Sequence, residues 1–170
     1  MSDIKGNDQT NYISRDMLLD RVTGIHKLEE PLVAYKSIRC DILKDNWLPW
    51  REPKVHKCRP CVATIEIPTG AKVVKHMSIN IESDPNEFPP ESMYRTDKFN
   101  ITKIEPASFV GDGKIMKSYA SMQDDYTDRI YEKDKIYEAK LENKPYGEGL
   151  KFYLDKKKAD QWLKYDDNIP

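Results

Sequence analysis

The chain has 170 residues and a formal net charge of -1, from 28 Lys and Arg against 29 Asp and Glu. This length fits one domain, and the balanced charge argues against a protein that coats nucleic acid or an anionic membrane. No apolar run approaches the roughly 20 residues that cross a bilayer, and the first ten residues lack the apolar core of a secretory signal. We therefore expect a soluble, cytoplasmic protein with neither duplex nucleic acid nor a membrane as partner.

The first 12 residues are polar and without periodicity, which predicts a flexible arm ahead of a single domain over residues 13–170. Ser14 is a good N-cap for a helix of about ten residues, because the apolar residues that follow it fall on one face. Gly24 can end this helix, since glycine readily adopts the left-handed conformation found after a helix C-terminus.

The middle of the chain is rich in β-branched and aromatic residues separated by turn-forming residues, which predicts a β-region. We expect strands over residues 32–40, 61–67, 71–75 and 99–105. Two long connections, residues 43–60 and 82–92, separate them. Residues 130–131 and 136–139 flank a polar tetrad, so this segment is either a hairpin or one bent strand.

The end of the chain has the clearest pattern. Residues 150–154 form an expected strand, and Asp155 is the N-cap of an expected helix over residues 156–165. Ala159, Trp162 and Leu163 fall on one face of this helix, which predicts that they pack on a sheet. The fold class is therefore α+β, with a mostly antiparallel central sheet, an N-terminal helix and a C-terminal helix.

The sharpest local motif surrounds a Cys-x-x-Cys pair, Cys58 and Cys61, with His56 two residues before it and Cys40 as a fourth possible ligand. This set suggests zinc. However, Cys61 begins an apolar strand, and no second pair of ligands closes the site, so we interpret the three cysteines as reduced, packed thiols. Our prediction for metals is none, with zinc as the open alternative.

Two indoles, Trp47 and Trp50, lie in the expected connection over residues 43–60, followed by Arg51 and Lys54. Aromatic rings beside cations are typical of sites where a base or another ring stacks. Tryptophans in loops also serve as lids over small cores. The loop is therefore either a ligand or partner surface or a cover of the core.

Four short blocks, read in order, resemble one family. The blocks are residues 33–39, 62–72, 94–104 and 149–160. Their order is similar to that in the domain of unknown function that often accompanies pentapeptide repeats in bacterial, phage and giant-virus proteins. This chain lacks the pentapeptide array, and Tyr94 stands where the family tends to have a cysteine. The resemblance implies a small α+β module with no established activity.

A second likeness involves the segment Gly147–Tyr153 and the following Lys158–Asp160. It is similar to the glycine, aromatic strand and helix that form part of the NAD pocket in ADP-ribosyltransferases. The usual catalytic histidine and serine have no counterparts at matching positions. If the fold is shared, the resemblance implies a binding descendant that kept a nucleotide-shaped cleft.

These observations lead to a non-enzymatic binding protein of viral or phage type, which sequesters a host immune nucleotide signal as an anti-defence sponge. The expected partner is a small nucleotide-like ligand or another protein, with homo-oligomers possible and with no catalytic residue and no cofactor. Arginines would bind phosphates and aromatic rings would stack on a base. The expected ligand-binding residues are Arg39, Trp47, Trp50, Arg59, Arg95 and Tyr153. The alternatives are an ADP-ribosyltransferase-like enzyme using NAD and a structural or assembly protein.

Overall fold

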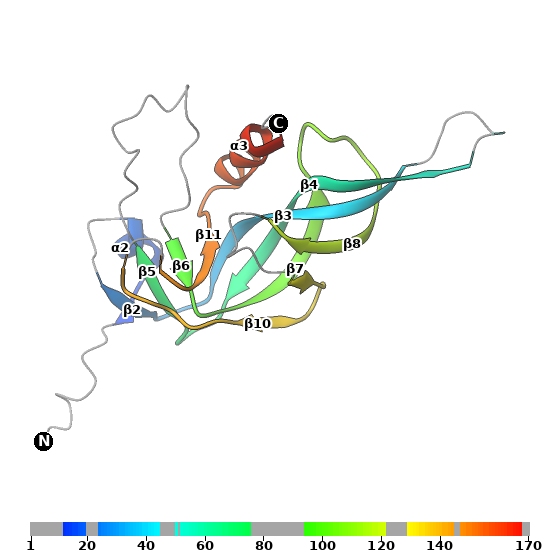
Figure 1. The fold of residues 1–170 in the computed structure, drawn as a ribbon. Helices are drawn as coiled ribbons and strands as arrows, with labels where there is room; N and C mark the ends of the chain where they lie inside the picture. Colours follow the sequence, from blue (N-terminus) through cyan, green and yellow to red (C-terminus); the bar gives the residue numbers. More distant parts are fainter. Residues whose placement is uncertain are drawn as a thin grey trace, which may run out of the picture.

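The computed structural model describes residues 12–19, 24–44, 50, 52–75, 94–121, 129–144 and 147–167 (Figure 1). Within these residues the fold is α+β, as predicted, with two β-sheets and one helix toward each end of the chain. The helices are α2 (Arg15–Leu19) and α3 (Lys156–Asp167). None of the described helices has the length and apolar composition that crossing a membrane requires.

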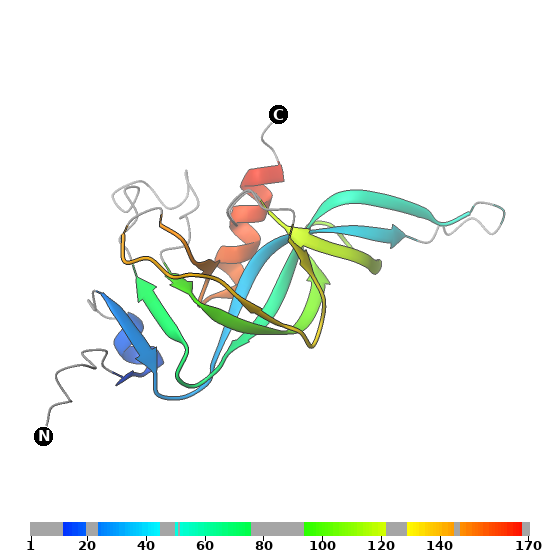
Figure 2. The ribbon, with the colours of Figure 1, turned by 60° about the horizontal axis from the view of Figure 1, so that its bottom comes forward.

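A six-stranded antiparallel sheet contributes about half of the buried hydrophobic residues that the structure describes. Its strands, in spatial order, are β10 (Ile136–Glu138), β7 (Lys98–Pro106), β4 (Lys54–Ile67), β3 (Leu32–Lys44), β8 (Lys114–Ala120) and β9 (Ile130–Tyr131). The sheet is curled, and β9 and β10 follow one another in sequence although they pair with opposite edges (Figure 2). The segment that contains them therefore joins the two edges and does not form a hairpin with itself.

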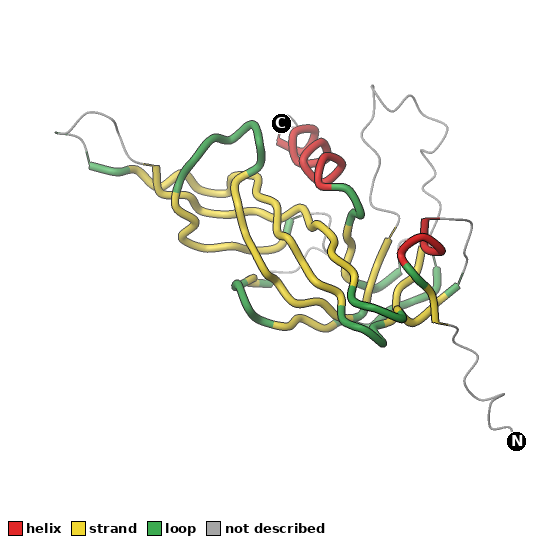
Figure 3. Tube along the Cα trace, turned by 180° about the vertical axis from the view of Figure 1, so that it is seen from behind, coloured by secondary structure: helices red, strands yellow, loops and turns green. Residues whose placement is uncertain are grey.

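A second, five-stranded sheet lies beside the first (Figures 1 and 3). Its order is β1 (Tyr12–Ile13), β2 (Ile25–Leu28), β5 (Lys72–Lys75), β6 (Tyr94–Thr96) and β11 (Leu150–Phe152). One residue, Asp97, separates β6 from β7, so the chain passes directly from one sheet into the other. The sheets are also joined where Tyr35 of β3 and Tyr153 exchange two backbone hydrogen bonds of 2.8 and 2.7 Å.

Helix α3 packs on the outer face of β3 and β4 (Figure 1). Ala159 and Leu163 are buried and Trp162 packs against the core, so the predicted apolar face of this helix is confirmed. The Ser37 hydroxyl on β3 donates a 3.0 Å hydrogen bond to the Ala159 carbonyl, which fixes the height of the helix on the sheet. The opposite face of β3 lines the interior of the curled sheet.

The expected connection over residues 43–60 is wrong in its second half, because β4 begins at Lys54 and pairs with β3 from Lys44 onward. Proline usually breaks a central strand because it cannot donate to the ladder. Pro60 is tolerated because the pairing of β4 with β7 begins only at Cys61. Among the described residues, β3 is therefore the only strand that pairs with β4 from Lys54 to Arg59.

Other elements differ in length or were not predicted. The N-terminal helix is described over five residues, and the Ser14 side chain caps it by accepting a 3.3 Å hydrogen bond from the Met17 amide. Residues 20–23, which the predicted helix includes, lie outside the described residues, as do residues 1–11 of the expected arm. Strands β1, β2, β6 and β8 were not predicted, because they are short or carry few β-branched residues in alternation.

Candidate functional site

The beginning of helix α3 lines an open pocket with a volume of about 520 Å³. The lining combines cations, one aromatic ring and two carboxylates: Arg15, Tyr35, Leu154, Asp155, Lys156, Lys157 and Asp160. These residues come from α2, β3 and α3, together with the turn that leads into α3. Small-ligand sites in proteins have volumes of about 300–1,000 Å³, so this pocket, named the α3 pocket below, has a suitable size.

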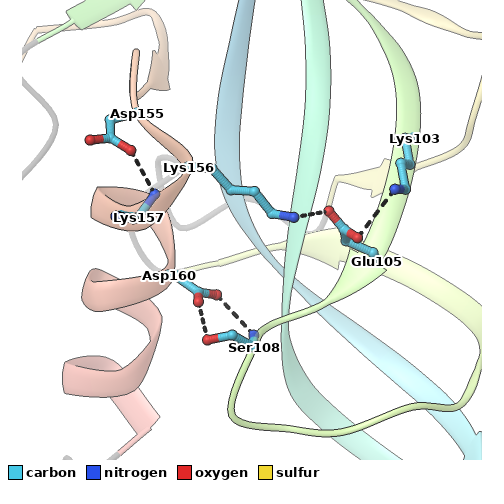
Figure 4. A network of polar contacts seen from close by, with 7 residues as sticks. All are labelled: Lys103, Glu105, Ser108, Asp155, Lys156, Lys157 and Asp160. Carbon is cyan, nitrogen blue, oxygen red and sulfur yellow. Dashed lines mark hydrogen bonds and ion pairs between the residues drawn. The ribbon is translucent and has the colours of Figure 1, made fainter.

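Local structure fixes the position of each element around the α3 pocket. Tyr35 is held by its two backbone hydrogen bonds with Tyr153, which directly precedes the turn into α3. Asp155 caps the helix, because its carboxylate accepts a 2.9 Å hydrogen bond from the Lys157 amide (Figure 4). Arg15 is the first residue of α2, directly after the capping Ser14. The pocket therefore forms only when the two ends of the domain meet.

The lining of the α3 pocket includes three cations and two carboxylates, and one of the cations, Lys156, is paired with Glu105 of β7. Both carboxylates are already engaged: Asp155 caps α3, and Asp160 accepts hydrogen bonds from the amide and hydroxyl of Ser108 (Figure 4). The positive end of the α3 dipole lies at the same place. The electrostatics of the pocket thus favour an anionic ligand.

Lys156 forms an ion pair with Glu105 on β7, which also pairs with Lys103 at 3.3 Å (Figure 4). The Lys156 contact, followed by that of Lys103, holds the pKa of the Glu105 carboxyl below its ordinary value. The ionised Glu105 therefore stabilises the folded state at pH values above the ordinary pKa of a carboxyl group. This stabilisation is lost as the pH falls through the lowered pKa of the folded protein. The groups are partly exposed, so the pair contributes at most about 1 kcal/mol to stability.

The cap of α3 gives a direct test of this local structure. Asp155→Ala is expected to lower the free energy of unfolding by about 1 kcal/mol, because an N-cap hydrogen bond is lost. Asp155→Asn should keep the stability close to that of the native chain, since asparagine caps helices as well as aspartate does. Urea denaturation followed by circular dichroism measures both. Equal stability of the Ala and Asn variants would contradict the capping role.

The structure divides the six predicted ligand-binding residues into two groups. Arg39 lies in β3, Arg59 lies in β4, and Trp50 lies in the connection between them with its side chain 75% exposed. None of the three lines the α3 pocket. The Arg39 guanidinium donates a 3.2 Å hydrogen bond to the Cys58 carbonyl. Trp47 lies outside the described residues.

The second group, Arg95 and Tyr153, is buried in the body of the domain, each with 3% of its surface exposed. The Arg95 guanidinium donates hydrogen bonds of 2.6 and 2.5 Å to the carbonyls of Glu148 and Lys144. In this arrangement Arg95 fixes the loop before β11 and does not line the α3 pocket. Tyr153 contributes to the pocket indirectly, through the backbone of Tyr35.

The cysteines do not gather around a common point. Cys40 and Cys61 are buried, whereas Cys58 is exposed. The contact with Cys40, together with burial, raises the pKa of the Cys61 thiol, which keeps it protonated. Within the described residues no group of three or more His, Cys, Asp or Glu is arranged to hold a metal ion. The zinc alternative therefore gains no support from the geometry.

Sequence reasoning missed the residues of the α3 pocket. It predicted the Asp155 cap and the strand that contains Tyr35 but assigned no binding role to Lys156 and Lys157. A basic pair directly after a helix cap was the available signal. The sequence contains no signal for Arg15, because residues as far apart along the chain as Arg15 and Lys156 come to line the same pocket only in the folded protein.

Comparisons with models of protein families, with curated proteins and with solved structures find no match to this chain. Both resemblances stated above therefore stay predictions.

Proposed function

We propose that this protein binds a small nucleotide-like anion in the α3 pocket. The observation that carries the proposal is the combination of three cations, an aromatic ring and a helix N-terminus around a pocket of about 520 Å³. Phosphate groups are bound by Lys and Arg and by helix N-termini, and a base can stack on an aromatic ring. Lys157 and Arg15 are the proposed phosphate ligands, and Tyr35 is the proposed stacking partner.

The proposed role is sequestration, in which the ligand is held and released unchanged. The composition of the α3 pocket supports a nucleotide-like anion as the ligand. The resemblance to a domain of phage and giant-virus proteins suggests which nucleotides to test first, namely cyclic dinucleotides and ADP-ribose derivatives, as examples of a host immune nucleotide signal.

Isothermal titration calorimetry of the full chain with cyclic dinucleotides, ADP-ribose, AMP, adenosine and inorganic phosphate tests the proposal. We expect heat with at least one of the phosphorylated nucleotides and weaker binding of both adenosine and phosphate alone, because each lacks one of the two recognised groups. Lys157→Gln and Arg15→Gln should each weaken binding about tenfold, as expected for a lost charged hydrogen bond.

Lys158→Gln is the matched control, because Lys158 is exposed on the same helix but does not line the α3 pocket. It removes the same charge and should leave the affinity unchanged. No heat with any nucleotide at high micromolar protein, or an equal loss in the Lys157 and Lys158 variants, would contradict the proposal. Transfer of labelled ADP-ribose from NAD to protein would instead support the enzymatic alternative.

A further inference from the structure

The six-stranded sheet extends beyond the body of the domain as a narrow, three-stranded end (Figures 1 and 2). This end, named the projection, consists of residues 39–44 of β3, 54–59 of β4 and 114–117 of β8, with Trp50 in the connection between β3 and β4. These residues of the projection contain seven Lys and Arg and one Asp, a formal charge of +6 in a chain with a total of -1. The rest of the sequence therefore carries -7, so the projection concentrates positive charge.

One face of the projection gathers cations. Arg39 lies opposite Tyr119, Asp41 opposite Lys117, and Leu43 between Val55 and Lys114. Cross-strand partners in an antiparallel sheet share a face, so these residues lie on the same side. This is the side that α3 covers nearer the body, because Ser37, two residues before Arg39, bonds to Ala159 of the helix. Beyond the end of α3 this face continues with Lys114 and Lys117 exposed.

Asp41 is the one carboxylate among these paired residues, and its hydrogen-bond partners lie on the neighbouring strands β8 and β4. Asp41 accepts a 2.8 Å hydrogen bond from the Tyr119 hydroxyl and a 3.1 Å hydrogen bond from the Cys58 amide. The Tyr119 bond, assisted by the amide and by the charges of Lys57 and Lys117, lowers the pKa of Asp41. Asp41 therefore orders the strands at the irregularity in their pairing and offsets only one of the positive charges around it.

Apolar and aromatic side chains are also exposed in the projection. Trp50 is 75% exposed, and Val55 and Met116 are also exposed. Cores of protein interfaces are depleted in lysine, whereas single-stranded nucleic acids are bound by lysines and arginines on the phosphates and aromatic rings on the bases. The projection combines both kinds of group of the second pattern. Lys114 and Lys117 are exposed on the face described above, Lys54 and Lys57 are exposed on β4, and the Trp50 indole is exposed in the connection between β3 and β4.

We propose that the projection binds single-stranded nucleic acid, with its lysines on the phosphates and Trp50 stacked on an unpaired base. A duplex offers no free base face, so the indole favours single strands. This surface is separate from the α3 pocket, because none of the residues that line the pocket belongs to the projection. The proposal therefore stands independently of the function assigned to that pocket.

Fluorescence anisotropy with the full chain tests the proposal, using labelled 20-nucleotide single-stranded DNA and RNA, the matching duplex and a 20-residue polyglutamate. We expect the tightest binding with a single strand and a fall in affinity as salt rises. The double variant Lys114→Gln with Lys117→Gln should weaken binding at 50 mM salt by about tenfold or more and reduce the slope of log K against log salt by about 1.4, since each phosphate contact on a single strand contributes about 0.7.

The matched control is Lys133→Gln with Lys140→Gln, which changes the net charge equally at exposed residues outside the projection. It should leave both the affinity and the salt slope close to those of the native chain. Trp50→Ala is expected to weaken binding about fivefold or more, and Trp50→Phe should restore most of it. Circular dichroism confirms that each variant is folded. No binding at low salt, an equal loss in the control, or equal binding of the duplex or polyglutamate would overturn the proposal.

Discussion

Replacing Phe99 by alanine is expected to lower the free energy of unfolding by about 3–5 kcal/mol. Phe99 is fully buried in the interior of the curled sheet, where its ring lies 6.0 Å from that of Tyr131 and 5.9 Å from that of Tyr137. These two tyrosines come from β9 and β10, the strands that pair with opposite edges of the sheet. The truncation therefore removes apolar contacts at the point where the two edges are held together.

Phe109→Ala is the matched control for this prediction, because Phe109 is 37% exposed in the turn after β7. The same atoms are removed, but much less apolar surface is lost from the core, so the cost should be about 1 kcal/mol or less. Urea denaturation monitored by tyrosine and tryptophan fluorescence gives both values. Similar losses at the two positions would show that Phe99 does not anchor the interior of the sheet.

The second large effect is expected for Gly149→Ala, with a loss of roughly 2–5 kcal/mol. Gly149 has a φ of +145°, which side chains rarely tolerate. A Cβ atom here would lie 2.7 Å from Leu141 Cδ1 and 3.0 Å from Arg95 Cβ. Arg95 cannot retreat easily, because its guanidinium is hydrogen-bonded to Glu148 and Lys144 on the same loop.

Gly70→Ala separates backbone strain from steric overlap. Gly70 also has a positive φ, +84°, but an added Cβ would meet nothing within 4 Å. This variant should therefore lose only about 1–2 kcal/mol, the cost of a left-handed conformation with a side chain. Thermal unfolding of both variants under identical conditions makes the comparison. A loss at Gly149 no larger than that at Gly70 would contradict the close packing around Arg95.

The local features near the end of the chain were predictable because each depends on neighbouring residues only. The Asp155 cap and the apolar face with Ala159 and Leu163 follow from helix geometry and from the preference of aspartate for N-caps. The α+β class and the strands at residues 61–67 and 99–105 followed from β-branched residues between turn signals. In these segments local preference and tertiary packing agree.

The sequence could not reveal the extension of β4 to Lys54, because a proline and several charged residues interrupt the usual strand pattern. Strand β3 provides the missing reason: it pairs with β4 along this whole segment and leaves Pro60 at the start of the pairing with β7. Likewise, Arg95 has the residue type of a phosphate ligand. Only the folded structure shows that its guanidinium is hydrogen-bonded to two backbone carbonyls of the loop before β11.

The sequence by itself determined the α+β class, the cap and buried face of α3 and the overall charge balance. Tertiary structure decided how that charge is distributed, because strand pairing brings residues 39–44, 54–59 and 114–117 into one basic projection. Tertiary structure also creates the α3 pocket, because it brings Arg15 and Lys157, which lie near opposite ends of the chain, into the same lining. The physical reason is that propensities and caps act over a few residues, whereas a binding surface depends on which distant segments the packing of the core brings together.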